Sequence, residues 1–352
     1  LHYNAILILK DWLTFRMADT NTAALVDLDL SRLSFVYNKS VNANKESLYL
    51  ESLIKMQDKY RQSPEYAEIG YYIAHFYYTR SEKFNFNDEL TFQYKGDKVK
   101  ALEICDLCNE KFPGSYGAKL CLSLKNDIQS KSLGFQIENF LAPAENFPML
   151  ITYRNIAKVY VRVGSIDPEA YQKLGNKFYG EKLYEQLLKT AKILKNYQFE
   201  LRGTNDFNNH STEAILESLP IGTYLIFLSN NEQFDYHKNV SNYSLVTVTG
   251  LSYIERVLND GNIEYTILDR NTGFPLKDVQ VKAIYHDYDY KSRAYKKFIY
   301  GTYTTDADGR CVVEFEKTKQ SKSISIELAY GRDFYDPDGS TYLYSRNYER
   351  SS

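Results

Sequence analysis

The pattern of apolar and polar positions changes character near residue 130. Before that point, apolar residues recur at the spacing of amphipathic helices. The predicted helices lie within residues 7–16, 29–37, 44–56, 65–81, 98–112 and 117–128. Ser63-Pro64-Glu65 is a helix start signal, since it combines a capping hydroxyl, a proline for the first helical position and an acid for the first turn. Residues 82–97 lack a clear period and are predicted to be a loop, so residues 1–130 form a helical domain.

After residue 130 the apolar positions follow the period of strands. Residues 149–152 and 156–163 look like an antiparallel pair, and Asp167-Pro168-Glu169 begins a helix inserted within residues 167–193. Further strands are predicted at residues 133–137, 197–201, 212–216, 224–228 and 245–249. Residues 131–249 are therefore expected to form an antiparallel β-sandwich that carries a helix insertion.

The last third repeats the strand pattern more clearly. Apolar and polar residues alternate over residues 263–267 and again over residues 279–283, and Asp269 to Asp278 between them holds the Gly, Pro and Asn of a turn. Asp306-Ala307-Asp308-Gly309 is predicted to be a hairpin turn into a third strand, in which Cys311, Val313 and Phe315 face the core. Residues 250–352 are therefore predicted to be a second antiparallel β-sandwich, which makes the chain a multidomain α plus β protein.

The helical part resembles tetratricopeptide repeats, in which paired helices pack through small residues. Two sets of residues fall at the spacing of the first and second helix of that repeat: Gly70, Ile73, Ala74 and Tyr77, and then Ala101, Cys105, Cys108 and Pro113. The loop between the two helices is longer than the repeat normally has. A generic stack of helical hairpins is the alternative.

Two motifs of the last third resemble the macroglobulin-like, immunoglobulin-like domains of bacterial (Bacteroides-type) alpha-2-macroglobulins. One is Leu268-Asp269-Arg270-x-Thr272-Gly273-x-Pro275-Leu276-x-x-Val279-x-Val281, and the other is Gly301-x-Tyr303-x-Thr305-Asp306-x-Asp308-Gly309. Weaker similarities occur at residues 219–226, at residues 246–251, and at residues 285–293, which resemble an insertion of the large exported members. The family resemblance implies a non-catalytic scaffold segment of an exported protein that traps proteases at the cell envelope. Its partners would be the other domains of the parent chain and, through the parent, proteases.

Composition narrows the class of partner. The chain has 43 Lys and Arg against 45 Asp and Glu, so its formal net charge of −2 argues against a nucleic-acid surface. No apolar run reaches the ~18 residues that a membrane-spanning helix needs. Because the chain opens on Leu1 without a signal-peptide layout, we expect a fragment cut from a longer protein.

The candidate chemical motifs are weak, and no catalytic, cofactor or metal site is predicted. Cys105-x-x-Cys108 fits a thiol or zinc site, but buried core cysteines are favoured, with Cys121 standing alone. Counted as a calcium loop from Asp306, the ligand positions fall on Arg310 and Lys317, so a turn is favoured there and at Asp336-Pro337-Asp338-Gly339. None of the cysteines is followed three residues later by the glutamine that thioester-forming relatives carry.

Aromatic residues crowd residues 71–92 and suggest a second class of function. A helical-repeat surface binds extended peptides through aromatic and polar side chains. The possible interaction surface consists of Tyr71, Tyr72, Tyr78, Phe84, Phe86 and Phe92. The alternative, which we favour, is that these rings fill the helical core and the loop that covers it. A third hypothesis, an enzyme or a carbohydrate-binding β-sandwich, is supported only by the abundant tyrosines.

Overall fold

The computed structural model describes residues 2–18, 22–202, 205–237, 239–290, 293–314, 322–337 and 339–343. The chain divides into two compact units. Unit 1 comprises Leu1–Ser132, Thr152–Ala157 and Leu201–His210, and unit 2 comprises Leu133–Ile151, Lys158–Glu200 and Ser211–Ser352. The chain is thus a mixed α and β protein, as predicted. The predicted positions Phe315, Lys317, Asp338, Lys291 and Ser292 and the segment 344–352 lie outside the described residues.

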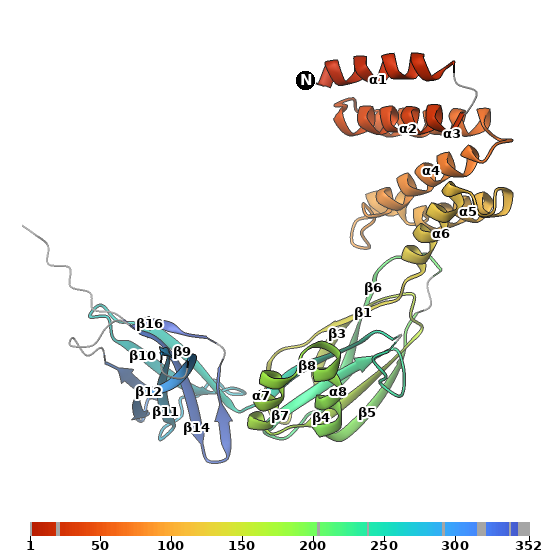
Figure 1. Ribbon diagram of the computed structural model, residues 1–352. Helices are drawn as coiled ribbons and strands as arrows, with labels where there is room; N and C mark the ends of the chain where they lie inside the picture. The colour runs from red at the N-terminus through yellow and green to blue at the C-terminus, as the bar shows by residue number, and fades with distance from the viewer. Residues whose placement is uncertain are drawn as a thin grey trace, which may run out of the picture. The chain divides into compact units, whose positions relative to one another are not determined.

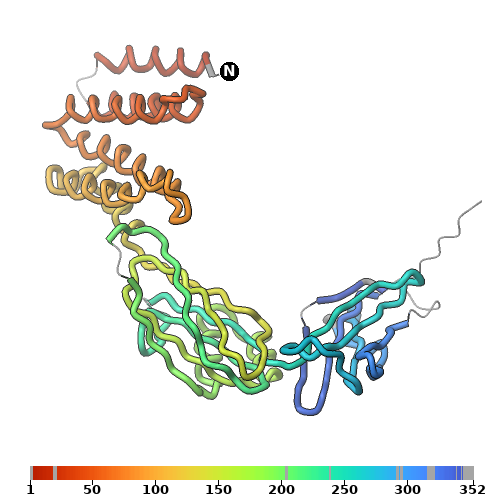
Figure 2. Tube along the Cα trace, turned by 180° about the vertical axis from the view of Figure 1, so that it is seen from behind, coloured from red at the N-terminus to blue at the C-terminus, as the bar shows by residue number. Residues whose placement is uncertain are grey.

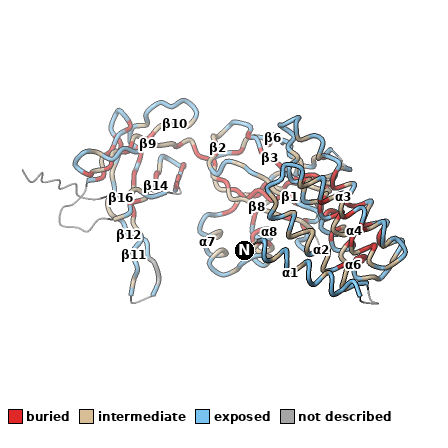
Figure 3. The backbone as a smooth tube through the Cα atoms, turned by 90° about the horizontal axis from the view of Figure 1, so that it is seen from above, coloured by how far each residue is buried: buried red, intermediate tan, exposed pale blue. Residues whose placement is uncertain are grey.

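Unit 1 is a stack of helices that follow one another in chain order (Figures 1 and 2). The helices are α1 (His2–Arg16), α2 (Thr22–Lys39), α3 (Lys45–Lys59), α4 (Glu65–Ser81), α5 (Asp97–Lys111) and α6 (Tyr116–Gln129). Each lies at a predicted position. One apolar cluster joins α2, α3 and α4, and another joins α4, α5 and α6, so α4 is buried on two sides. Figure 3 colours the buried residues red along the chain. None of the described helices is long and apolar enough to span a bilayer.

Two local predictions in this unit are wrong. The hydroxyl of Ser63 does not cap α4; it donates backwards to the carbonyl of Tyr60 at 3.2 Å, and Pro64 takes the N-cap position without a side-chain hydrogen bond. The predicted loop at residues 82–97 contains a 3-10 helix, η1 (Glu89–Tyr94), because the Asp88 carboxylate accepts the N–H of Leu90 at 3.1 Å. Both differences arise from hydrogen bonds that periodicity does not register.

The α4–α6 contact depends on Gly117. A Cβ placed on Gly117 would lie 2.0 Å from the backbone nitrogen of Glu68, so only glycine lets the two helices approach this closely. Gly70 of α4 likewise faces the Sγ of Cys108, which a Cβ would meet at 2.2 Å. Gly70 and Cys108, two of the residues with the spacing of the repeat, therefore lie at a helix crossing, while the identity of the stack as a tetratricopeptide array stays a prediction.

The first β region consists of two sheets. One has the order β1 (Ser132–Gln136), β3 (Phe147–Arg154), β6 (His210–Leu216), and the other has the order β2 (Phe140–Leu141), β8 (Ser241–Val248), β7 (Gly222–Ser229), β4 (Lys158–Ser165), β5 (Lys192–Glu200). The predicted antiparallel pairing of residues 149–152 with 156–163 is wrong, since β3 and β4 belong to different sheets. Between them Asn155 has φ of 56°, and its side-chain amide donates to the carbonyls of Ile128 and Ser130. The two strands are therefore joined by a crossing from one sheet to the other.

The inserted segment forms two helices where one was predicted. Asp167 caps α7 (Pro168–Lys177) as expected, by accepting the N–H of Ala170 at 2.9 Å. Gly180, with φ of 55°, then begins α8 (Gly180–Thr190). Tyr184 and Leu187 of α8 pack against Leu225 and Phe227 of β7. Strand β7 is consequently covered on both faces, which explains why its sequence is continuously apolar.

The second β region contains the two sheets of a sandwich. Their orders are β13 (Arg310–Val313), β10 (Ile263–Asp269), β9 (Leu251–Val257), and β12 (Ala294–Thr304), β11 (Gln280–Asp289), β14 (Lys322–Tyr330), β15 (Asp333–Tyr335), with β16 (Thr341–Leu343) also paired to β14. The alternation predicted for residues 263–267 and 279–283 is confirmed, because the expected residues are buried in one cluster.

Two pairing predictions need correction. The Asp306–Gly309 turn joins β12 to β13, which lie in different sheets, so it is an arch between sheets and not a hairpin. The first β region is not purely antiparallel, since β2 pairs with β8 in parallel through Phe140 and Thr247. Local turn signals fix where the chain reverses but leave the choice of hydrogen-bonding partner to long-range packing.

Candidate interaction surface

The six aromatic residues of the candidate surface fall into two groups. Tyr71, Tyr72 and Tyr78 belong to α4, and the remaining three follow it in the connection to α5. Tyr71, His75 and Tyr78 share one side of α4, with ring centroids 5.7 Å apart for the first pair and 6.4 Å for the second. We call these three residues the α4 stripe. Tyr72 points instead into the cluster with α2 and α3 and meets Tyr71 edge-on at 5.6 Å.

The α4 stripe is half-exposed. The rings of Tyr71 and Tyr78 rest on the α4–α5–α6 core, and His75 between them is open to solvent. Burial raises the pKa of the Tyr71 hydroxyl, and partial desolvation between the two tyrosine rings lowers the pKa of the His75 imidazole, so both side chains favour their neutral forms. The stripe therefore offers uncharged aromatic faces with hydrogen-bonding edges.

The second group surrounds Phe84. Its ring centroid lies 4.6 Å from that of Phe86 and 5.8 Å from that of Phe92, and Phe86 also meets His210 at 4.8 Å. His210 is held by Asp206, whose carboxylate lies 2.9 Å from the imidazole Nε2. Phe86 and Phe92 keep 44% and 46% of their surface exposed. This cluster is partly a cover for the helical core and partly open surface, so the structure divides the predicted set in two.

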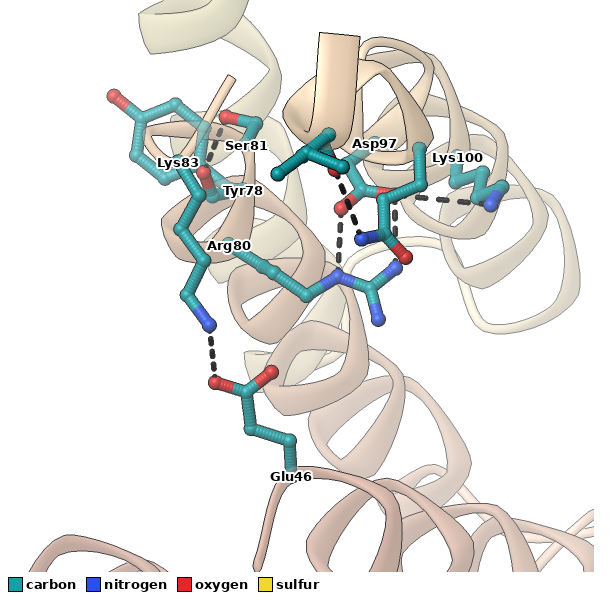
Figure 4. A network of polar contacts seen from close by, with 9 residues as sticks. Glu46, Tyr78, Arg80, Ser81, Lys83, Asp97 and Lys100 are labelled. Carbon is teal, nitrogen blue, oxygen red and sulfur yellow. Dashed lines mark hydrogen bonds and ion pairs between the residues drawn. The ribbon is translucent and has the colours of Figure 1, made fainter. Parts of the chain in front are cut away.

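An ion pair that the sequence did not predict fixes the end of α4 against the start of α5 (Figure 4). The guanidinium of Arg80 donates two hydrogen bonds, at 2.7 and 2.9 Å, to the two carboxylate oxygens of Asp97, which is fully buried. The same guanidinium lies over the rings of Phe76, Tyr77 and Tyr94 at 5.3, 4.9 and 5.7 Å. The pair closes the loop of residues 82–97 and thereby positions the Phe84 cluster.

Further charges surround this pair. Lys83 bonds Glu46, and that hydrogen bond raises the pKa of the lysine. Lys98 is buried, lies 3.5 Å from Glu82 and sits over the ring of Tyr78 at 6.0 Å. Hydrogen bonding to Asp97 likewise raises the pKa of Arg80 against the effect of burial. These charges are already paired within the protein, so the network supports the surface and leaves recognition to the aromatic rings.

The cysteines of this region form a buried group. Cys105 and Cys108 lie on α5 and Cys121 on α6, and all three are fully buried, as predicted for small core residues. Cys121 does not stand alone, because it packs in the same buried cluster as the other two cysteines, and its thiol donates to the carbonyl of Ala67 at 3.9 Å. The neighbouring sulfurs and burial raise the pKa of Cys121, while the Cys121 thiol lowers the pKa of Cys108. The group fills the α4–α5–α6 core beside Gly70.

The motif residues of the last third form two interlocked turns. The Asp269 carboxylate accepts the backbone N–H and the hydroxyl of Thr272 at 2.9 and 2.8 Å. The Asp306 carboxylate accepts two backbone N–H groups, those of Asp308 and Arg310, both at 2.9 Å. Buried Thr305 joins the turns, since its hydroxyl donates to the carbonyl of Leu276 at 2.6 Å. The acids of these motifs therefore organise backbone and do not form a separate ligand set.

Arg270 and Asp333 hold the segment that enters this sandwich. Arg270 donates to the carbonyls of Thr249 and Leu251 at 3.1 and 2.7 Å, and its guanidinium lies 5.4 Å from the Tyr335 ring centroid. The carboxylate of Asp333 accepts the N–H of Gly250 at 2.7 Å. Sequence reasoning noticed Arg270 only as part of a motif and missed Asp333, because no local pattern marks a contact so distant along the chain.

No protein-family model and no curated protein matches the chain significantly. Solved structures of alpha-2-macroglobulin from Escherichia coli are similar to parts of it. A fragment spanning domains MG0-NIE-MG1 has a TM-score of 0.39 at 15% identity over 58% of this chain and 64% of that one. A fragment spanning NIE-MG1 has a TM-score of 0.35 at 17% identity over 62% and 98%.

The native conformation of the Escherichia coli protein has a TM-score of 0.32 at 18% identity, over 58% of this chain and 12% of that chain. The chain therefore spans 64% of the first structure and only a small part of this longer one. These proteins belong to the family that the sequence motifs resemble. TM-scores below 0.5 at such identities assign neither a family nor an activity to the chain.

Proposed function

We propose that this chain is a non-catalytic scaffold segment of an exported alpha-2-macroglobulin-like protein that traps proteases at the cell envelope. The observation that carries the proposal is the pair of motifs at residues 268–281 and 301–309, whose turns are joined by hydrogen bonds in the structure. Partners would be the other domains of the parent chain, and proteases through that parent.

The side-chain hydrogen bonds to residues 249–251 support the scaffold role. A scaffold must transmit position from one module to the next, and Arg270 and Asp333 satisfy three backbone groups of this short connection. Their hydrogen bonds involve charged groups, which are stronger than neutral ones. The connection is thereby built to resist local unfolding, the property that a positioning module needs.

Two experiments test the scaffold proposal. Equimolar chain is added to a protease acting on a large protein substrate and, separately, on a small peptide substrate. Neither reaction should slow, because the trapping parts lie elsewhere in the parent; slowing of the large-substrate reaction alone would show that this chain traps by itself. In limited proteolysis, Arg270→Ala should expose cleavage near residues 249–251, whereas the exposed Arg256→Ala should not.

A second candidate function is binding of extended peptides by the helical stack, which we propose to be tetratricopeptide-like. The observation that favours it is the half-exposed α4 stripe of Tyr71, His75 and Tyr78. Peptides enriched from a display library should lose affinity for Tyr78→Ala and keep it for Tyr116→Ala, a tyrosine with 66% exposure on α6. Phe92→Ala tests whether the Phe84 cluster belongs to the same site. A library that yields no peptide sensitive to Tyr78→Ala would refute this function.

A further inference from the structure

The two carboxylates of helix α8 and a histidine from the loop after β7 converge at one place on unit 2. Glu181 and Glu185 are one turn apart on α8, so their side chains lie on the same face. The Nε2 of His237 lies 2.8 Å from Oε1 of Glu181. One ligand atom from each of the three residues lies within 4.8 Å of the other two. The sequence analysis did not connect these residues.

The histidine is delivered by an anchored loop. Phe234 is buried at 3% exposure, and the Arg162 guanidinium lies 4.2 Å above its ring while also donating to the carbonyl of Glu232. Next along the loop, the Tyr236 ring packs on Tyr184 of α8 with a centroid separation of 5.2 Å. The backbone N–H of His237 is bonded to the Asp235 carboxylate at 3.0 Å. Packing and hydrogen bonds therefore place the imidazole against α8 in advance of any ligand.

We propose that Glu181, Glu185 and His237 form a binding site for one divalent transition-metal ion of the zinc class. Zinc binds imidazole nitrogen and carboxylate oxygen at about 2.0–2.2 Å, so two ligand atoms on a tetrahedral ion lie about 3.4 Å apart. The present separations are 2.8 Å for one pair and at most 4.8 Å for the others, so small side-chain rotations reach that distance. Water completes the coordination, since His237 is exposed and the two glutamates are half-buried.

The donor set selects the class of metal. Calcium and magnesium prefer sites built from oxygen alone, whereas a neutral imidazole favours zinc and its neighbours in the transition series. Binding displaces the weak contact of Lys189 with Glu185, which spans 3.8 Å. It also replaces the hydrogen bond between His237 and Glu181 by two bonds to the metal. The ion would tie the loop at residues 230–237 to α8, beyond any role that the scaffold proposal assigns.

The test titrates Zn²⁺ into the chelator-stripped full chain by calorimetry. One ion should bind per chain, and both His237→Ala and Glu185→Gln should weaken binding at least about tenfold, since loss of even an outer-shell partner costs 10–100-fold. Glu169→Gln is the matched control, because Glu169 belongs to a similar glutamate–lysine pair on α7. Ca²⁺ should not displace the bound zinc.

Cys121→Ser separates this site from the buried cysteines. Its zinc binding should equal that of the unchanged chain, and bound Co²⁺ should show no thiolate charge-transfer band. The proposal is overturned if no stoichiometric zinc binds, if His237→Ala leaves the affinity unchanged, or if Cys121→Ser abolishes binding. An ordinary His–Glu ion pair would give the first of these results.

Discussion

Gly309 tests how the two motif turns are locked together. It is buried and has φ of 70°, and a Cβ added there would lie 2.6 Å from the carbonyl oxygen of Ile267 and 3.0 Å from the nitrogen of Leu276. The Leu276 N–H donates a hydrogen bond to the Ile267 carbonyl at 2.9 Å, and the Ile267 N–H donates one to the Gly309 carbonyl at 2.8 Å. In Gly309→Ala the new methyl group would therefore push into the hydrogen bonds that connect the motifs.

Gly273 is the matched control within the same pair of motifs. Its φ of 72° is nearly identical, but nothing lies within 4 Å of an added Cβ. Alanine at Gly273 should cost only the left-handed backbone conformation, about 1–2 kcal/mol. Alanine at Gly309 adds about 1–3 kcal/mol for backbone groups left unpaired and about 1–3 kcal/mol for overpacking. The difference between the two variants should therefore be about 2–6 kcal/mol, the sum of these two ranges.

Hydrogen exchange followed by mass spectrometry can measure this difference locally, because the chain has two units and one global unfolding energy is not defined. Peptides from β10, β11 and β13 should lose more protection in Gly309→Ala than in Gly273→Ala, and peptides from α1–α6 should be unchanged in both. Equal loss in the two variants, within about 0.5 kcal/mol, would refute the steric reasoning, since only backbone conformation would then matter.

Three further outcomes follow from single contacts. Gly117→Ala should destabilise the helical unit by about 1–3 kcal/mol through its clash with the α4 backbone. Gly175→Ala, in open space on α7, should instead stabilise by about 0.5–1 kcal/mol. Hydrogen exchange of peptides from α6 and α7 separates the two signs. Asp97→Ala should cost about 3 kcal/mol by the same assay, because Arg80 is left unpaired with 21% exposure, and Arg80→Met with Asp97→Leu should recover part of this loss. Burial raises the pKa of Cys311 from 9.0 to about 11. Alkylation of this thiol in the native state near pH 8 should therefore be roughly 100-fold slower than that of an ordinary thiol, which mass spectrometry of the labelled peptide checks. The stability linked to this shift is present below pH 9 and lost as the pH rises through 11, which a pH series of unfolding checks.

The helices were predictable because their signal is local. A 3.6-residue period survives whatever the helix packs against, so each α-helix of unit 1 appears where the sequence predicts it, whereas the 3-10 helix η1 does not. The interruption at Gly180 was not predictable from the apolar stripe, which continues on both sides of it. The aromatic surface was predicted only as a set of residues, since the partner of Phe86 is His210, a residue contributed by a distant part of the chain.

Strand positions were predictable for the same reason, but their sheet membership was not. Alternation states that one face of β3 or β4 is buried, and both sheets of a sandwich satisfy that condition equally well. Sheet membership depends on whether the connecting turn returns along the same sheet or crosses the core. The chain crosses between sheets at Asn155 and at the Asp306–Gly309 turn. Side-chain hydrogen bonds hold both places, from Asn155 to the carbonyl of Ile128 and from the N–H of Arg310 to the Asp306 carboxylate.

Because they cross between sheets, the motif turns should contribute more stability than their length suggests. A hairpin turn joins strands that already bond each other, so its loss leaves the ladder in place. A crossing turn joins strands of opposite sheets. Here the turn between β12 and β13 is hydrogen-bonded to the connection between β10 and β11 through Thr305, and to β10 itself through Gly309. Changing Gly309 should therefore loosen the contact between the sheets, whereas alanine at Gly273, where an added Cβ meets nothing within 4 Å, should have a local effect.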